Sequence, residues 1–181
     1  MSNPIKVTTQ EMARVAAAEY CNSAGIVSVV VVLDNVRSKN NIGSIFRTSD
    51  AMGISKIYLC GITAVPPDRD IHKTALGAEN SVPWEYAGDI HSVLDFLQGA
   101  GYRLYAVELT HNSLKLGHDH IETDRPIALI FGNEIDGVQE SVLECCDAFL
   151  EIPQYGSKHS LNVSCAAAIA IWEITKQLRV K

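Results

Sequence analysis

The chain lacks any two cysteines spaced as in a zinc site or a redox pair. The 181 residues include 5 Cys, an odd number, and none forms a Cys-x-x-Cys pair. The pattern argues against a disulfide framework, and we expect reduced, mostly buried thiols. His118 and His120, with His111 upstream, lack a third well-spaced ligand, so we expect no metal.

Long hydrophobic runs are also absent. The longest nearly apolar stretch covers residues 24–33 and is interrupted by Ser28, so it is far shorter than the roughly 20 residues of a transmembrane helix. The N-terminal segment MSNPIKVTTQEMARV has no apolar core like that of a signal peptide. These absences predict a cytoplasmic protein that does not bind a membrane.

Positive charge is in deficit. The chain has 15 Lys+Arg and 21 Asp+Glu, which gives a formal net charge of −6. This balance argues against a protein that coats nucleic acid through bulk electrostatics, and any nucleic-acid partner must be held by a local basic patch. Hydrophobic residues make up 47% of the chain, enough for one folded domain with a sizeable core.

Strands and helices alternate along the chain. The β-branched run IVSVVVVL at 26–33 is too apolar for a strand with one wet face and predicts a strand buried on both sides, as in parallel sheets. We also expect strands at 56–60, 102–107, 127–131 and 148–152, and helices near 41–52, 89–98, 138–145 and 161–178. The fold class is therefore α/β, a mostly parallel sheet with helices on both faces, whose ligands bind beyond the carboxyl ends of the strands.

The first 25 residues are expected to be an accessory element, with the main domain over residues 26–181. Thr8 and Glu11 have capping-box spacing, which predicts a short helix over residues 8–20.

Three loops at the carboxyl ends of predicted strands carry polar residues. In the first, Asn40 or Asn41 can cap a helix that turns Arg47 outward, and Arg37 and Lys39 add charge for a phosphate site. An ordinary capped helix with solvated charges is the alternative. The predicted sheet-facing residues of this helix are Ile42, Ile45, Phe46 and Ser49.

The second loop contains Gly132, Glu134 and Gly137. Glycine there permits a close backbone approach by a ligand. Glu134 can orient a ligand or an arginine, or simply favour the N-terminus of the following helix.

The third loop turns near Gly156 and enters the last helix, which Ser160 can cap, while Asn162 adds an amide at the first turn. This helix is apolar on two sides, so one face needs a partner beyond the sheet, which an isologous dimer would supply. One side carries Leu161, Cys165, Ile169 and Trp172, and the other Val163, Ala167, Ile171, Ile174 and Leu178.

Together these loops resemble the motifs of the SpoU (TrmH-like) branch of the SPOUT RNA 2′-O-ribose methyltransferases, over roughly residues 26–178. The resemblance implies S-adenosylmethionine as cofactor, an RNA substrate with tRNA favoured over rRNA, a homodimer and a C-terminal trefoil knot. General topology rules argue against a knot, so this expectation comes from the resemblance alone. The matching residues are Asn41, Gly43 and Arg47; Gly132, Glu134 and Gly137; and Ile152, Pro153, Gly156, Ser160, Leu161, Asn162 and Val163.

The resemblance also implies roles for individual residues. The catalytic set is Arg47, Asn41, Glu134, Ser160 and Asn162. The cofactor-binding set is Leu109, Thr110, Gly132, Ile152, Gln154, Gly156, Ser160 and Leu161. The RNA-binding set is Arg37, Lys39, Arg47 and Lys158, and Arg69, Lys73 and His159 are further candidates for a basic patch.

Several alternatives stay open. Within the enzyme class, a D-loop guanosine of tRNA is the favoured target, with wobble-position tRNA or rRNA as alternatives. A catalytically silent RNA- or nucleotide-binding module on the same fold is the rival from another class. A Rossmann dehydrogenase is disfavoured because no Gly-x-Gly-x-x-Gly follows the first strand. Arginine is a poor general base, so Arg47 is first expected to clamp a phosphate and stabilise a developing alkoxide.

Overall fold

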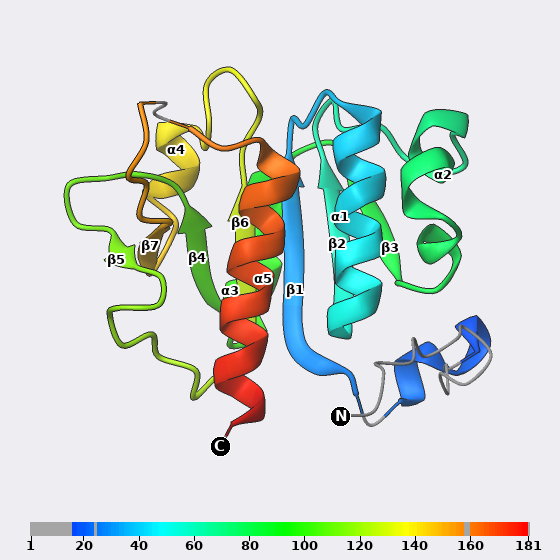
Figure 1. Cartoon of the computed structure of the whole chain (residues 1–181), viewed down its shortest axis with the longest axis horizontal. Helices are drawn as coiled ribbons and strands as arrows, with labels where there is room; N and C mark the ends of the chain where they lie inside the picture. Colours follow the sequence, from blue (N-terminus) through cyan, green and yellow to red (C-terminus); the bar gives the residue numbers. More distant parts are fainter. Residues whose placement is uncertain (1–15, 24, 158–159, 181) are drawn as a thin grey trace, which may run out of the picture.

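A seven-stranded sheet organises the chain (Figure 1), with the strand order β3-β2-β1-β6-β4-β7-β5 and parallel pairing between all neighbours. This computed structural model describes residues 16–23, 25–157 and 160–180. The strands are β1 Val27–Asp34, β2 Ile54–Cys60, β3 Trp84–Ala87, β4 Arg103–Val107, β5 Leu114–Lys115, β6 Ile127–Phe131 and β7 Ala148–Glu151.

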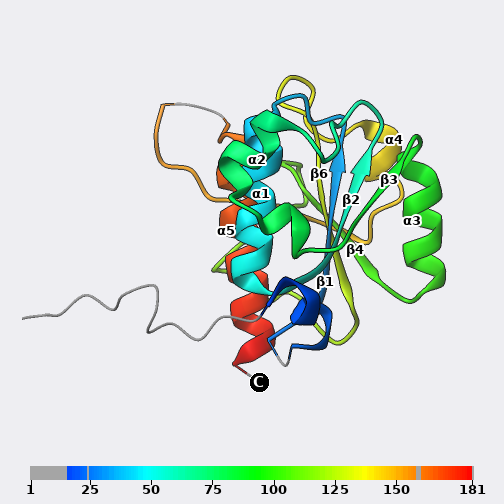
Figure 2. The same cartoon turned by 90° about the vertical axis from the view of Figure 1, so that its right-hand side faces the viewer.

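Helices cover both faces of the sheet (Figure 2), as predicted. Helices α1 and α5 lie on one face with α2 packed outside α1, and α3 and α4 lie on the other. The helices are α1 Lys39–Met52, α2 Arg69–Ala75, α3 Ile90–Gly99, α4 Glu140–Leu143 and α5 Val163–Arg179, with 3₁₀ helices η1 Ala17–Asn22 and η2 Ala78–Asn80.

Strand β1 is buried on both sides over residues 29–34, which confirms the prediction from its apolar run. Val31 and Leu33 pack into the core shared with α1 and α5. Val30 and Val32, on the opposite side of the strand, pack into the core shared with α3. Because alternate side chains of a strand point to opposite faces, a run without polar positions can serve two cores at once.

Helix α1 presents the predicted apolar face to the sheet, and Ile42, Ile45 and Phe46 are fully buried. The cap differs from the prediction. Ser38 is the N-cap, and its hydroxyl accepts a hydrogen bond from the Asn41 backbone N–H. Since the helix begins at Lys39, neither Asn40 nor Asn41 takes the capping position, and the Asn41 side chain is left available for other contacts.

Helix α5 confirms the two-sided pattern, with Ala167, Ile171 and Ile174 buried, but its cap also differs from the prediction. Asn162 is the N-cap, and its side-chain oxygen accepts from the Ser164 N–H. Ser160 lies before the cap, too early in the chain to reach the first turn.

Four short elements were not predicted: α2, η2, β3 and β5. Each has seven residues or fewer, or lies at an edge of the sheet, and β3 carries the mixed segment WEYA, whose side chains are half-buried or exposed. Short elements with mixed polarity show little periodicity. The helix predicted over residues 8–20 falls largely outside the described residues, and Ala17–Asn22 forms a 3₁₀ helix.

The cysteines are less buried than expected. All five are free thiols, but Cys60 is buried while Cys145 and Cys146 are half-buried and Cys21 and Cys165 are exposed. The prediction of mostly buried thiols was therefore wrong. Burial raises the pKa of Cys60 and Cys146 to about 12, so both stay protonated at neutral pH. Over the described part of the chain, no helix has the length and apolar character needed to cross a membrane.

Candidate active site

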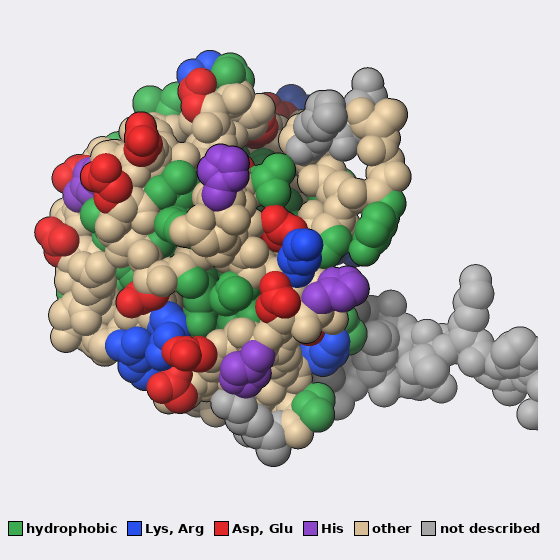
Figure 3. All heavy atoms as spheres, turned by 90° about the vertical axis from the view of Figure 1, so that its left-hand side faces the viewer, with side chains coloured by type: hydrophobic (Ala, Val, Ile, Leu, Met, Phe, Trp, Pro, Cys, Tyr) green, Lys and Arg blue, Asp and Glu red, His purple; other side chains and the backbone are tan. Residues whose placement is uncertain are grey.

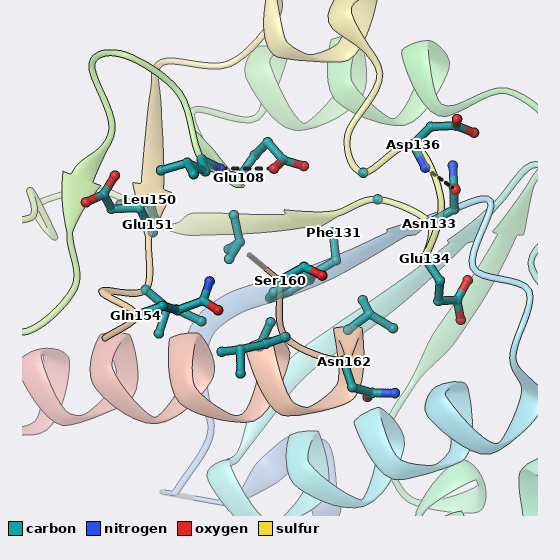
Figure 4. A pocket seen from close by; sticks show the side chains of 18 of the residues that line it. Glu108, Phe131, Asn133, Glu134, Asp136, Leu150, Glu151, Gln154, Ser160 and Asn162 are labelled. Atoms are coloured by element: carbon teal, nitrogen blue, oxygen red, sulfur yellow. Dashed lines mark hydrogen bonds between the residues drawn. The ribbon is translucent and has the colours of Figure 1, made fainter. Parts of the chain in front are cut away.

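A cavity of about 750 Å³ opens beyond the carboxyl ends of β4, β6 and β7. Its floor includes Val107, Phe131 and Leu150, at or near the ends of these three strands. In Figure 4 side chains of the surrounding loops converge on it, with Glu134 on one side, Gln154 on the other and Ser160 between them. The predicted place for a ligand, beyond the carboxyl ends of parallel strands, thus coincides with a cavity of ligand size.

A chain of hydrogen bonds joins all three motif loops at one side of this cavity. The Asn162 side-chain amide donates to Asn41 Oδ1 over 3.1 Å, and the Asn41 amide donates to Glu134 Oε1 over 3.0 Å. Residues separated by 121 and 93 positions in sequence therefore form one polar cluster. Three residues predicted to act together lie together.

The Glu134 carboxylate is an acceptor for the N-terminal end of α1. It also accepts from the backbone N–H groups of Arg37 and Ser38, each over 3.2 Å. Burial raises its pKa, but the hydrogen bonds from Arg37, Asn41 and Ser38 together outweigh burial and leave the pKa below its usual value. Glu134 is thus an ionised anchor for α1, rather than for α4, the helix that follows it in sequence.

The glycines of the second loop allow a tight backbone turn. Asn133 and Gly137 exchange N–H···O hydrogen bonds of 3.1 Å in each direction. A Cβ atom on Gly132 would lie 1.9 Å from the Gly137 carbonyl oxygen, and Gly137 has a φ of 67°. Both positions therefore exclude larger residues. Gly132 is crowded by backbone atoms, and Gly137 lies in the left-handed region.

Most residues of the predicted cofactor-binding set line the cavity. Thr110 does not line it; the Thr110 Oγ1 is buried without a hydrogen-bond partner among the described residues. The set members that do line the cavity are Leu109, Gly132, Ile152, Gln154, Gly156, Ser160 and Leu161.

The predicted RNA-binding residues lie along α1, outside the cavity lining. Arg37 and Lys39 flank the helix N-cap, and Lys39 forms a salt bridge of 2.8 Å with Asp68. Arg47 is exposed two turns further along. Lys158 and His159 lie outside the described residues.

One residue that the sequence patterns did not indicate also lines the cavity. The Glu108 carboxylate accepts from the Leu109 N–H over 3.0 Å and from the Val138 N–H over 2.9 Å. It ties the loop after β4 to the loop after β6. Its position directly after a predicted strand was the available signal, because polar residues at strand carboxyl ends face the ligand crevice.

The cavity suits an organic ligand with a positive charge. Apolar side chains from β6, β7 and α5 line part of it, and Glu108 and Glu134 are among its lining residues. The Glu151 carboxylate points away from it, toward Ser113 and Lys115. Among the residues that the structure describes, no group of three or more His, Cys, Asp or Glu side chains is placed to hold a metal ion.

Comparison with known proteins places this geometry in a family. The model of the SpoU rRNA Methylase family matches residues 28–172. The chain belongs to this family. SpoU proteins form the TrmH branch of the SPOUT methyltransferases, and the expectation drawn from the three motifs is confirmed.

Two curated SpoU relatives illustrate the similarity. The tRNA (guanosine(18)-2′-O)-methyltransferase of Thermus thermophilus is 33% identical over 151 residues, which are 82% of this chain and 75% of that protein. A Staphylococcus haemolyticus protein named for the TrmH family of tRNA/rRNA methyltransferases is 29% identical over 150 residues, 83% of this chain. The match spans 59% of that relative.

Solved SpoU structures share the fold. The TrmH/SpoU tRNA modifying enzyme of A. aeolicus superposes with a TM-score of 0.79 at 26% identity, covering 91% of this chain and 81% of that one. The AdoMet-bound rRNA methyltransferase of Sinorhizobium meliloti superposes with a TM-score of 0.78 at 28% identity, covering 88% and 60%. The predicted α/β architecture is thereby confirmed.

Proposed function

We propose that this SpoU protein transfers a methyl group from S-adenosylmethionine to a ribose 2′-hydroxyl of tRNA, with a D-loop guanosine as the favoured target. The observation that carries the proposal is the hydrogen-bonded cluster of Asn162, Asn41 and Glu134 beside a cavity of cofactor size. The tRNA preference is supported by the Thermus relative, which is named for position 18 of tRNA.

The cavity would hold the cofactor between its apolar walls and the backbone of its loops. Leu109, Ile152 and Leu161 provide apolar contacts on three different segments. When bound, S-adenosylmethionine supplies a methyl group on a positively charged sulfonium. A carboxylate at the cavity, such as that of Glu108, favours a cation over a neutral ligand.

The polar cluster would orient the reacting ribose. Asn41 and Asn162 hold each other through one amide–amide hydrogen bond, and Glu134 fixes Asn41 from the other side. Side chains held by such bonds lose little further freedom when a ribose docks, and positioning of this kind contributes several kcal/mol to catalysis. Ser160, exposed at the same cavity, would contact the ribose or the cofactor.

Arg47 would clamp the phosphate next to the target ribose. It makes no hydrogen bond or ion pair with any described residue, so its five N–H donors are available to a phosphate group. A protonated guanidinium stabilises the developing alkoxide, and a phosphate oxygen takes the hydroxyl proton.

Transfer of a radiolabelled methyl group from S-adenosylmethionine into separately purified tRNA and rRNA tests this function. We expect label in tRNA, located at a 2′-O-methylated guanosine, and a loss of at least 100-fold in Arg47→Ala, typical for removal of a transition-state donor. Arg125→Ala, which removes an exposed arginine far from the cavity lining, is the matched control and should retain activity.

Each other outcome of this experiment would support one of the alternative functions. Label in rRNA alone, or at a wobble nucleotide, would replace the proposed substrate while keeping the reaction. Cofactor binding without transfer to any RNA would contradict the enzyme and favour a silent binding module. The trefoil knot, the homodimer and the cytoplasmic location stay predictions.

A further inference from the structure

A second cavity, of about 550 Å³, lies at the opposite edge of the sheet from β7, beside α2 and β3. It shares no lining residue with the first cavity. Its lining residues are Pro66, Pro67, Asp68, Arg69, His72, Glu79, Asn80 and Trp84. Its volume is within the range of small-ligand sites and is enough for one nucleotide.

The walls of this second cavity combine flat rings with polar groups. Trp84, half-buried, contributes an indole, and His72 and the two prolines contribute further ring surfaces. His72 is held in place by Glu79, whose side chain is 7% exposed and whose Oε1 lies 2.5 Å from His72 Nδ1. Ring faces of this kind are the surfaces on which unpaired bases stack, irrespective of sequence.

The rim supplies groups for a phosphate and a base edge. Arg69 is exposed and makes no hydrogen bond or ion pair with any described residue, and the exposed Asn80 side chain offers both a donor and an acceptor. Lys73 is exposed on α2, the helix that begins at Arg69. Arginine next to an aromatic ring suits a ligand with a phosphate and a base.

The two cavities lie on either side of the N-terminus of α1. Glu134, from the first cavity, accepts from the Ser38 N–H, and Asp68, from the second, pairs with the next residue, Lys39. Arg37 is exposed at the same helix end. A polymer with a phosphate at every step can pass Arg37 at this helix end and occupy both cavities, whereas a small molecule can occupy only one.

The edge of the molecule at β5 and β7 carries charges of both signs. In Figure 3, which faces the edge formed by β5 and β7, blue, red and purple side chains are interspersed over the surface. This edge therefore offers no continuous basic surface to a polyanion.

We propose that the second cavity binds an unpaired nucleotide of the RNA substrate, at a position other than the methylated one. This inference rests on the proposed function only in taking RNA as the ligand. The base would stack on Trp84, Asn80 would contact its edge, and Arg69 would hold its phosphate.

Filter binding of tRNA to Arg69→Glu and Arg125→Glu tests the proposal. Both variants make the same charge change at exposed arginines, so bulk electrostatics affects them equally. We expect Arg69→Glu to raise the Kd for tRNA about tenfold and to reduce the slope of log K against log salt by about 1, with less than a twofold change in Arg125→Glu. Equal effects in the two variants, or none in Arg69→Glu, would overturn the proposal.

Tryptophan fluorescence tests the stacking separately. The chain has 2 Trp, so Trp172→Phe leaves Trp84 as the sole reporter. Emission from this variant should be quenched by saturating tRNA, because a base stacks on the indole. Unchanged emission at saturation would contradict the site.

The two proposals can fail independently. Tight tRNA binding that depends on Arg69, without methyl transfer, would refute the reaction and keep the nucleotide site. Methyl transfer to RNA, with tRNA binding unaffected by Arg69→Glu, would confirm the reaction and refute the nucleotide site. Calorimetry of S-adenosylmethionine binding is the folding control. Arg69→Glu and Arg125→Glu should bind the cofactor with the same Kd if both are folded.

Discussion

At the scale of single residues, the site depends on carboxylate side chains that accept hydrogen bonds from backbone N–H groups. Glu134 accepts two backbone N–H groups at the start of α1 and one side-chain amide. Glu108 accepts two backbone N–H groups that belong to two different loops. Each carboxylate therefore positions a loop of the cavity, and its removal acts on geometry as well as on charge.

Replacement of Glu134 by Gln should lower the free energy of unfolding at pH 7 by about 1 kcal/mol, since an amide has one acceptor oxygen in place of two. The pKa of Glu134 is lowered in the folded state from its ordinary 4.5. Its contribution is therefore complete above pH 4.5 and is lost as the pH falls through the folded pKa.

Urea unfolding of wild type and Glu134→Gln at pH 7 and at pH 3.5 measures this difference. The gap between the two proteins should shrink at the lower pH. Glu144→Gln, at an exposed glutamate outside the cavity, is the control. A gap that is equal at both pH values would show that the lowered pKa has no part in stability.

Replacement of Gly132 by Ala should displace the second loop, because the new Cβ would lie 1.9 Å from the Gly137 carbonyl oxygen. We expect the Kd for S-adenosylmethionine to rise at least tenfold, since the loop lines the cavity. Isothermal titration calorimetry measures it. Gly88→Ala, whose Cβ would meet no atom closer than 4.0 Å, should bind like wild type; equal binding by Gly132→Ala would refute the steric argument.

At the scale of elements, α1 connects both cavities to the core. Its buried side packs on the sheet through Phe46 and its neighbours, its N-terminus contacts Glu134 and Asp68, and α2 packs against it. The close approach of α2 depends on Gly43, where a Cβ would lie 2.2 Å from the Ile71 carbonyl oxygen. The motif glycine of this helix is thus a packing residue.

Gly43→Ala should lower the free energy of unfolding by about 1–2 kcal/mol. Overpacking against the α2 backbone costs about 1–3 kcal/mol, which the better helix propensity of alanine offsets only in part. Gly99→Ala in α3, with no atom within 4 Å of its Cβ, should have no such cost. Thermal unfolding compares the two, and a Gly43→Ala protein as stable as wild type would contradict the contact.

At the scale of the whole molecule, the outer face of α5 exposes large apolar side chains. Ile169 is 41% and Trp172 57% exposed on this helix, although its other side is buried in the core. Exposed apolar stripes of this kind mark interaction surfaces, and a second copy is the commonest partner.

Trp172→Glu should convert a dimer into a monomer, because a charge in an apolar interface core is strongly unfavourable. Light scattering coupled to size exclusion measures the mass. Phe96→Glu is the matched control, since Phe96 is 62% exposed but lies on α3, on the other face of the sheet. A monomeric wild type, or a dimer that survives Trp172→Glu, would remove α5 from the interface.

Local patterns in the sequence were enough to predict the larger helices and strands. The apolar run of β1 and the helical periodicity of α1 and α5 determine which residues are buried, because burial follows from side-chain direction along a regular backbone. The sequence also predicted the three polar loops at strand ends and their proximity at one edge of a parallel sheet.

Only the tertiary structure decided the contacts between these loops. The contacts of Glu134 with α1 rather than α4, and the hydrogen bond from Asn162 to Asn41, join groups 93 to 121 positions apart. The second cavity likewise combines α2, η2 and β3, elements too short to show periodicity. Local spacing determines the direction of a side chain along its own element, but its partner across the fold is set by how separate elements pack.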